Sequence, residues 1–198
     1  MPAAELWSLI AFATAMAFTP GPNTALSAAL GANRGLRVAL RFVVAVPVGW
    51  GLLLAACVAG LGAALEAAPA ARWAVKGAGL VYMLWLAWRL AHSAELGQAR
   101  GTLEVGFWQG VLLQFVNIKA WMNALLISAG WVTVGPDWPD RLAVVLPLMM
   151  AYGLASNLTY ALVGSSLRRW LAQGRRLLGF NRALALVLVV TAGWMAQR

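Results

Sequence analysis

The chain has 198 residues, of which 62% are hydrophobic and only 11% are charged, and its formal net charge is +9. Soluble domains are about 45–50% apolar and about 25% charged, so this composition excludes an ordinary water-soluble domain and indicates that lipid surrounds much of the protein. The positive charge does not indicate a nucleic-acid partner, because the arginines lie between apolar stretches of bilayer-spanning length, where basic residues are typical topology signals.

Six apolar stretches are long enough to cross a bilayer, which takes about 20 residues. The loops between them are short, so we predict one all-α membrane domain over residues 1–198, with neighbouring spans antiparallel. The first stretch begins without a basic segment and continues past Pro22, so we interpret it as a retained span rather than a cleaved signal peptide. The predicted spans are residues 6–30, 42–65, 73–91, 106–132, 142–164 and 177–195.

Two prolines around a glycine interrupt the first predicted span, in the segment Thr19-Pro20-Gly21-Pro22-Asn23. Prolines lack the N–H that a helix uses, and their rings crowd the carbonyls four residues earlier. We therefore expect a break that leaves the carbonyls of Met16 and Phe18 facing inward as acceptors. The helix that restarts near Pro22 would point its positive N-terminal end into the same space. Irregular backbone at membrane depth persists only where protein covers it or water reaches it, which favours a functional break over a packing kink.

A lysine, Lys119, lies near the middle of the fourth predicted span. A lysine at the centre of a membrane helix costs about 2.5–3.5 kcal/mol on insertion scales, and no acidic residue is predicted at a similar depth. Its partners would be the freed carbonyls of the first span, an anionic group of a ligand, or both. The alternative is a purely structural role, in which Lys119 only holds the first break. Further polar side chains on this helix are Gln114, Asn117 and Asn123.

Basic residues alternate from loop to loop. The first, third and fifth loops are rich in arginine, whereas the second and fourth carry few basic residues. Arginine-rich loops stay on the cytoplasmic side, so we predict that both termini lie outside, in the periplasm. The arginines of the odd loops are Arg34, Arg37 and Arg41, then Arg89 and Arg100, then Arg168, Arg169, Arg175, Arg176 and Arg182.

The interruptions divide the six spans into two sets of three. Pro20 and Lys119 lie at corresponding depths of the first and fourth spans, and Pro47 and Pro147 lie early in the second and fifth. Because three is odd, the two sets have opposite orientation in the membrane. Interrupted helices at matching places of inverted halves indicate the midplane site of a transporter.

Side chains suited to catalysis or metal binding are scarce in the predicted spans. The only histidine, His92, lies at a span end, and the only cysteine, Cys57, lies in an apolar run. Without paired carboxylates or a Cys/His set at one depth, we predict no enzyme activity, no cofactor and no metal site. A helix N-terminus with Lys119 suits a carboxylate, and freed carbonyls suit an ammonium. Charge alone thus favours a zwitterion such as an amino acid.

Three segments resemble signatures of the LysE/RhtB amino-acid exporters. Phe18–Asn23 is similar to the T-P-G-P-N motif, Gln114–Trp121 to an N-P-K-A-W stretch, and Lys76–Trp88 to the third-span pattern. The resemblance covers nearly the whole chain and implies a bacterial inner-membrane exporter of amino acids or their derivatives, driven by proton-motive force. Ile118 stands where the family usually has proline, which predicts a milder break in the fourth span.

Together, the residues and the resemblance predict six transmembrane helices as two inverted repeats that alternate access around a midplane site. The expected partners are a small zwitterionic substrate and the lipid bilayer, and small residues spaced four apart leave homodimer formation open. A non-transporting membrane scaffold subunit is the main alternative. A metal-ion exporter is a third option, which the lack of intramembrane acids disfavours. The predicted substrate-binding residues are Thr19, Pro20, Gly21, Pro22, Asn23, Gln114, Asn117 and Lys119.

Overall fold

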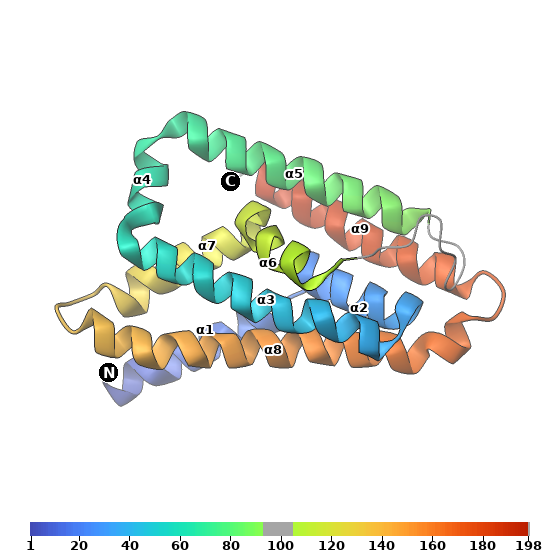
Figure 1. Cartoon of the computed structure of the whole chain (residues 1–198), viewed down its shortest axis with the longest axis horizontal. Helices are drawn as coiled ribbons and strands as arrows, with labels where there is room; N and C mark the ends of the chain where they lie inside the picture. Colours follow the sequence, from blue (N-terminus) through green and yellow to red (C-terminus); the bar gives the residue numbers. More distant parts are fainter. Residues whose placement is uncertain (93–104, 198) are drawn as a thin grey trace.

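The computed structural model describes residues 1–92 and 105–197, and these residues are almost entirely helical, with no β-strand among them (Figure 1). The prediction of an all-α protein is confirmed. Two of the elements, η1 and η2, are single π-helical segments that continue an α-helix. The elements in chain order are α1 (Ala3–Phe18), α2 (Pro22–Arg34), α3 (Leu36–Ala56), η1 (Cys57–Leu61), α4 (Gly62–Ala67), α5 (Pro69–Ala91), α6 (Phe107–Val116), α7 (Ile118–Ile127), η2 (Ser128–Val132), α8 (Trp138–Leu171) and α9 (Arg176–Ala196).

Several of these helices have the length and composition of membrane spans. Two bent pairs qualify together: α1 with α2, which meet at 51°, and α6 with Ile118–Val132, which meet at 71°. The predicted third span lies on α5, which has 23 residues but falls short in hydropathy, since it carries Arg72, Lys76 and Arg89. By length and composition the described residues thus hold up to five spans. The stretches that qualify singly are Leu36–Leu65, Trp138–Leu171 and Arg176–Ala196.

The two ends of the helical bundle differ in charge. In Figure 1 the N-terminus, the α3–α5 connection and the turn before α8 lie at one end, and the turns at Gly35 and Gly174 lie at the other. Both glycines adopt positive φ, 83° and 58°, which L side chains rarely do. The arginine-rich first and fifth loops therefore share one end, as the charge pattern predicted for loops on the same side. Arg100, counted for the third loop, lies outside the described residues.

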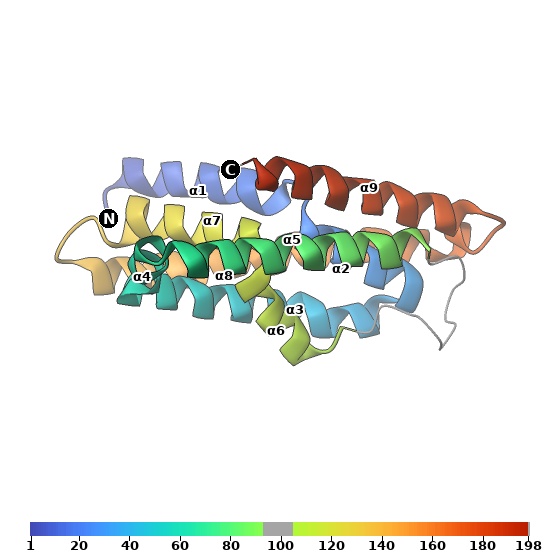
Figure 2. The ribbon, with the colours of Figure 1, turned by 90° about the horizontal axis from the view of Figure 1, so that it is seen from above.

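The two halves of the first broken span have different surroundings. Only Leu9 and Ala13 of α1 are buried, whereas eleven of the 13 residues of α2 are buried. α2 contacts α3, α8 and α9, while Figure 2 shows α1 along one edge of the molecule. The second half of this span is therefore the central helix of the fold, and the first half is peripheral.

Glycines allow α2 and α8 to touch through their backbones. A Cβ added at Gly31 would lie 2.2 Å from the carbonyl oxygen of Ala161, and one added at Gly164 would lie 2.1 Å from that of Ala28. Small residues at helix crossings are typical of membrane proteins, because close approach supplies the van der Waals contact that holds the helices together. This crossing fixes α2 in the centre and so positions the break that precedes it.

The fourth-span break is sharp, although Ile118 replaces the usual proline. Its 71° bend exceeds the 51° bend of the first span, which contains two prolines, so the expectation of a mild break was wrong. Asn117 takes an extended conformation (φ −88°, ψ 103°), and its side-chain oxygen accepts a hydrogen bond from the backbone N–H of Lys119. A side-chain N-cap of this kind stabilises the start of a new helix, which explains why the break persists without a proline.

Replacing Ile118 with proline should therefore change stability little. Proline is well tolerated at the first position of a helix, and Asn117 already has the extended backbone that favours a following proline. We expect the thermal melting temperature in detergent to stay within about 4 °C of wild type, which corresponds to a change of about 1 kcal/mol. Ala124→Pro, inside α7, is the control and should lower it by about 6–12 °C. Equal losses for the two variants would contradict this account of the break.

Candidate functional site

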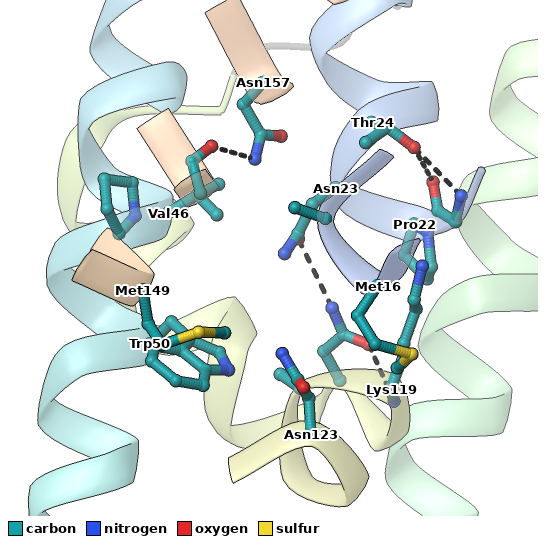
Figure 3. A pocket seen from close by; sticks show the side chains of 16 residues that line it. Met16, Pro22, Asn23, Thr24, Val46, Trp50, Lys119, Asn123, Met149 and Asn157 are labelled. Atoms are coloured by element: carbon teal, nitrogen blue, oxygen red, sulfur yellow. Dashed lines mark hydrogen bonds between the residues drawn. The ribbon is translucent and has the colours of Figure 1, made fainter. Parts of the chain in front are cut away.

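A small cavity of about 80 Å³ lies where the two helix breaks meet. Residues of α1, α2, α3, α7 and α8 line it (Figure 3). Lys119 is the one charged side chain among the lining residues, and none of them is acidic. The helices α2 and α7 both begin at this place, and helix N-termini carry about half a positive charge. The cavity is therefore electrostatically suited to an anionic group.

Lys119 connects the two breaks directly. Its Nζ donates a hydrogen bond of 2.7 Å to the backbone carbonyl of Thr19. To reach it, the side chain crosses Gly21, where an added Cβ would lie 3.0 Å from Cδ and 3.2 Å from Nζ of the lysine. The lysine thus has a carbonyl at the first break as its partner, but it is the carbonyl of Thr19 and not one of the Met16 and Phe18 carbonyls that were expected to be freed. A neutral carbonyl does not neutralise its charge.

Hydroxyl groups of α8 satisfy other carbonyls at the end of α1. Tyr160 donates to the carbonyl of Phe18 at 2.9 Å, and Ser156 donates to that of Ala17 at 2.5 Å. The sequence had suggested that the Phe18 carbonyl would face a ligand, but it instead accepts from Tyr160. α8 therefore holds the broken end of α1, in keeping with the rule that irregular backbone in a membrane is covered by protein.

Three amide side chains join the breaks a second time. Asn23 Nδ2 donates to Gln114 Oε1 at 2.8 Å, while Asn23 Oδ1 accepts from Gln114 Nε2 at 3.2 Å and from Asn117 Nδ2 at 3.3 Å. Gln114 and Asn117 are buried, at 0% and 3% exposure. Buried polar networks with all members paired give a unique arrangement. This network fixes the start of α2 relative to the α6–α7 break.

Caps complete the helix start at the first break. The backbone N–H of Gly21 donates to Thr24 Oγ1 at 2.9 Å, and the Thr24 hydroxyl donates to the Gly21 carbonyl at 3.1 Å. Close by, Ser27 donates to Asn157 Oδ1 at 2.9 Å, and Asn157 Nδ2 donates to the Gly153 carbonyl at 2.8 Å. The bond between Ser27 and Asn157 ties α2 to α8 along the wall of the cavity.

The structure brings most of the sequence-predicted residues together. Gln114 lies behind the wall, bonded to Asn23. Thr19 supplies its carbonyl, but the side chains of Thr19 and Pro20 are exposed on the surface rather than in the cavity. The predicted residues that line the cavity are Gly21, Pro22, Asn23, Asn117 and Lys119.

Several lining residues were not assigned to the site from the sequence, and two of them bring polar side chains from other spans. Trp50 comes from α3 and Asn157 from α8. A polar residue inside the apolar fifth span was a usable signal for Asn157. Nothing in the sequence indicated that Trp50 belongs to the site, because a tryptophan in a membrane helix is usually an ordinary apolar residue. Asn123 had been noted as polar but not assigned to the site, and it also lines the cavity.

An ion-pair cluster ties the beginning of α1 to the beginning of α8. Arg141 donates to Glu5 at 2.7 Å and to Asp137 at 2.8 Å. The hydrogen bond from Arg141 holds the pKa of the Asp137 carboxyl below its ordinary value. The indole N–H of Trp131 donates to the Glu5 carbonyl, and its ring lies 5.3 Å from that of Phe12, tilted by 37°. These contacts hold α1 against η2 and α8 at the end of the bundle that carries the N-terminus.

In the described part of the chain, no three His, Cys, Asp or Glu side chains come together. The arrangement instead offers a fixed cation, two helix N-termini and amide groups around a small space. Such a set can bind a carboxylate-bearing molecule through hydrogen bonds and charge. It contains no nucleophile paired with a base and so presents no recognisable catalytic arrangement.

The chain is similar in sequence to a known protein family. The sequence model of the LysE type translocator family matches residues 14–197. A cysteine/O-acetylserine efflux protein of Klebsiella pneumoniae subsp. pneumoniae is 33% identical over 177 residues, and proteins of the same name from Escherichia coli and Shigella flexneri are 32% identical over 181 residues. In each case the similarity covers 89% of this chain and 89% of the relative. No solved structure matches the chain.

Proposed function

The chain belongs to the LysE type translocator family, and we propose that it is a secondary exporter of amino acids or their derivatives. Its similar relatives are named as cysteine/O-acetylserine efflux proteins, which supports a small zwitterionic amino acid as the substrate. The substrate would bind in the cavity between the two breaks. Proton-motive force would drive the export across a bacterial inner membrane.

One observation carries the site assignment. Lys119 lies in a broken membrane helix with a neutral carbonyl as its hydrogen-bond partner, and no acidic residue among those that the structure describes lines the cavity. A membrane-buried cation without a counter-charge is costly, and a substrate carboxylate would relieve that cost. The N-terminal ends of α2 and α7 add positive potential at the same place.

The proposed binding residues divide into those that contact the substrate and those that position them. Lys119 and the N-terminal turn of α2, from Gly21 to Asn23, would contact the carboxylate. Asn117 and Gln114 would hold that turn through the amide network. Thr19 would hold Lys119 when the site is empty, and Pro20 would keep the helix broken.

The architecture that supports transport is a single domain of six spans in two inverted sets of three. The spans would be α1 with α2, α3 with η1 and α4, α5, α6 with α7 and η2, α8, and α9. In an inverted repeat of this kind, span one corresponds to span four and span two corresponds to span five. The contact between spans one and five therefore corresponds to the contact between spans four and two. Both contacts use glycine: Gly31 and Gly164 between α2 and α8, Gly49 and Gly110 between α6 and α3. The correspondence holds between whole spans but not between their halves, since α2 is the second half of span one and α6 is the first half of span four.

The arginine-rich end of the bundle would face the cytoplasm, with both termini in the periplasm. Contacts at the opposite end support a shared side for the termini, since Arg141 binds Glu5 near the N-terminus and Lys76 donates to the carbonyl of Ala196 near the C-terminus. Because α5 and α8 both start at that end, both termini would lie on the same side of the membrane. The two sets of helices would then rock around the cavity, and the Glu5–Arg141 ion pair would open when the site faces outward.

Transport by the purified protein tests the proposal. Vesicles containing the protein, with an imposed proton gradient, should move labelled L-cysteine, O-acetyl-L-serine or another amino acid of a panel, and an uncoupler should abolish the movement. Empty vesicles and vesicles with a denatured sample are the controls. If correctly folded protein moved no amino acid, the exporter proposal would fail, and the result would favour the alternative of a non-transporting scaffold subunit. Transport of a divalent cation instead would favour a metal-ion exporter.

A further inference from the structure

Two buried polar atoms at the cavity have no hydrogen-bond partner within the described part of the chain. They are the indole Nε1 of Trp50 and the side-chain oxygen of Asn123. Both residues line the cavity between the helix breaks, and Trp50 is only 7% exposed. Figure 3 shows Trp50 and Lys119 on opposite sides of this space, with Asn123 between them.

Unpaired buried groups need a physical reason. A buried donor or acceptor without a partner loses its hydrogen bonds to water and gains none in return, and nearly all such groups in proteins are paired. Here one orphan is a donor and the other is an acceptor, and both lie at the same cavity. The neighbouring amides Asn23 and Asn117 are paired with each other. A polar molecule in the cavity would satisfy both orphans at once.

We propose that Trp50 and Asn123 contact the substrate and select it by its polar atoms. The inference rests on the proposed export function. With the substrate carboxylate at Lys119, the ammonium donates to the side-chain oxygen of Asn123. The indole N–H of Trp50, across the cavity from Lys119, then donates to an acceptor atom in the substrate side chain.

The lining defines the substrate class. Val46 and Met149 bring apolar surface beside Trp50, and the cavity of about 80 Å³ leaves little room for a long side chain. The absence of an acidic lining residue disfavours a second cation, since a buried charge needs a partner. The site therefore suits a small neutral amino acid whose side chain carries a hydroxyl or ester oxygen. An aliphatic isostere would leave Trp50 unpaired.

The test compares two isosteric substrates, L-serine and L-2-aminobutyrate, in the vesicle assay. The wild type should prefer serine, and Trp50→Phe should lower serine transport relative to 2-aminobutyrate by roughly fivefold, the factor expected for one hydrogen bond. Phenylalanine keeps an aromatic ring but has no N–H to donate. Trp108→Phe, at a position 72% exposed and not among the residues that line the cavity, is the matched control and should leave the ratio unchanged.

Asn123→Leu, of similar volume, should lower transport of both substrates together, because both carry the ammonium that Asn123 binds. A water molecule filling the cavity predicts instead that neither variant changes the serine preference or the rates, and that result would overturn the inference. The proposed function is tested separately, by transport in the wild type and by the effect of replacing Lys119, and neither measurement uses a Trp50 variant. An active wild type with an unchanged Trp50→Phe ratio would refute only the role of Trp50 in selection.

Discussion

Lys119→Met is expected to reduce export by about one to two orders of magnitude while the protein still folds in the membrane. The lysine would give the substrate carboxylate a charge-assisted hydrogen bond, and such bonds contribute about 1.5–3 kcal/mol. Methionine keeps much of the side-chain length and the apolar contacts but has no charge to offer.

Folding should tolerate this change because two effects oppose each other. The Thr19 carbonyl loses its donor, which costs about 1–3 kcal/mol. The span also loses a central charge, which saves about 2.5–3.5 kcal/mol on insertion scales. We therefore expect a near-normal amount of folded protein and a strongly reduced rate.

Lys76→Met provides the matched control for Lys119→Met. Lys76 is the other lysine of the chain, and it bonds the Ala196 carbonyl at one end of the bundle, away from the breaks. Its replacement should leave export near the wild-type rate. The rate in vesicles, normalised to folded protein in each sample, is the measurement. Full export by Lys119→Met would refute the assignment of the site, and a collapse of folded protein would favour a purely structural lysine.

Gly164→Ala should cause the largest loss of stability of any methyl addition considered for this chain. The new Cβ would meet the backbone oxygen of Ala28 at 2.1 Å, and a backbone oxygen cannot rotate away as a side chain can. Overpacking a core typically costs about 1–3 kcal/mol, and separating α2 from α8 also weakens Ser27–Asn157 and the other contacts of the central helix. We expect the melting temperature in detergent to fall by about 6–12 °C or more.

Gly193→Ala is the control for this prediction, because it lies in α9, where an added Cβ meets nothing within 4 Å. Alanine forms helices better than glycine, so Gly193→Ala should melt at or slightly above the wild-type temperature. Similar melting of the two variants would mean that α2 and α8 can separate cheaply. It would then be wrong to regard the α2–α8 crossing as the fixed element of the fold.

The local sequence determined where the helices are and where they break. Apolar length gave the positions of the long helices, because backbone groups in lipid must be bonded within a helix. Pro20 and Pro22 separate α1 from α2 because proline lacks a backbone N–H and its ring clashes with the carbonyl four residues earlier. The position of Lys119 in the middle of an apolar stretch already required a polar partner from another segment.

Two expectations from the sequence were wrong, because each depends on a neighbouring residue that was not considered. Ile118 suggested a weak break, because the effect of its missing proline was weighed without the cap that Asn117 provides. The carbonyl of Phe18 was expected to face a ligand, but whether a freed carbonyl meets a ligand or a hydroxyl depends on the neighbouring helix. Here Tyr160, 142 positions later in the chain, supplies the hydroxyl.

The chain by itself therefore determined its helical segments, the two breaks and most of the polar residues between them, because proline, glycine and a charge in lipid act through local physics. The tertiary structure alone decided that α2 is central and α1 peripheral, and that Trp50 and Asn157 join the cavity. Those outcomes depend on which helices can approach closely, as at Gly31 and Gly164. Contacts between residues far apart in the chain leave no local pattern in the sequence.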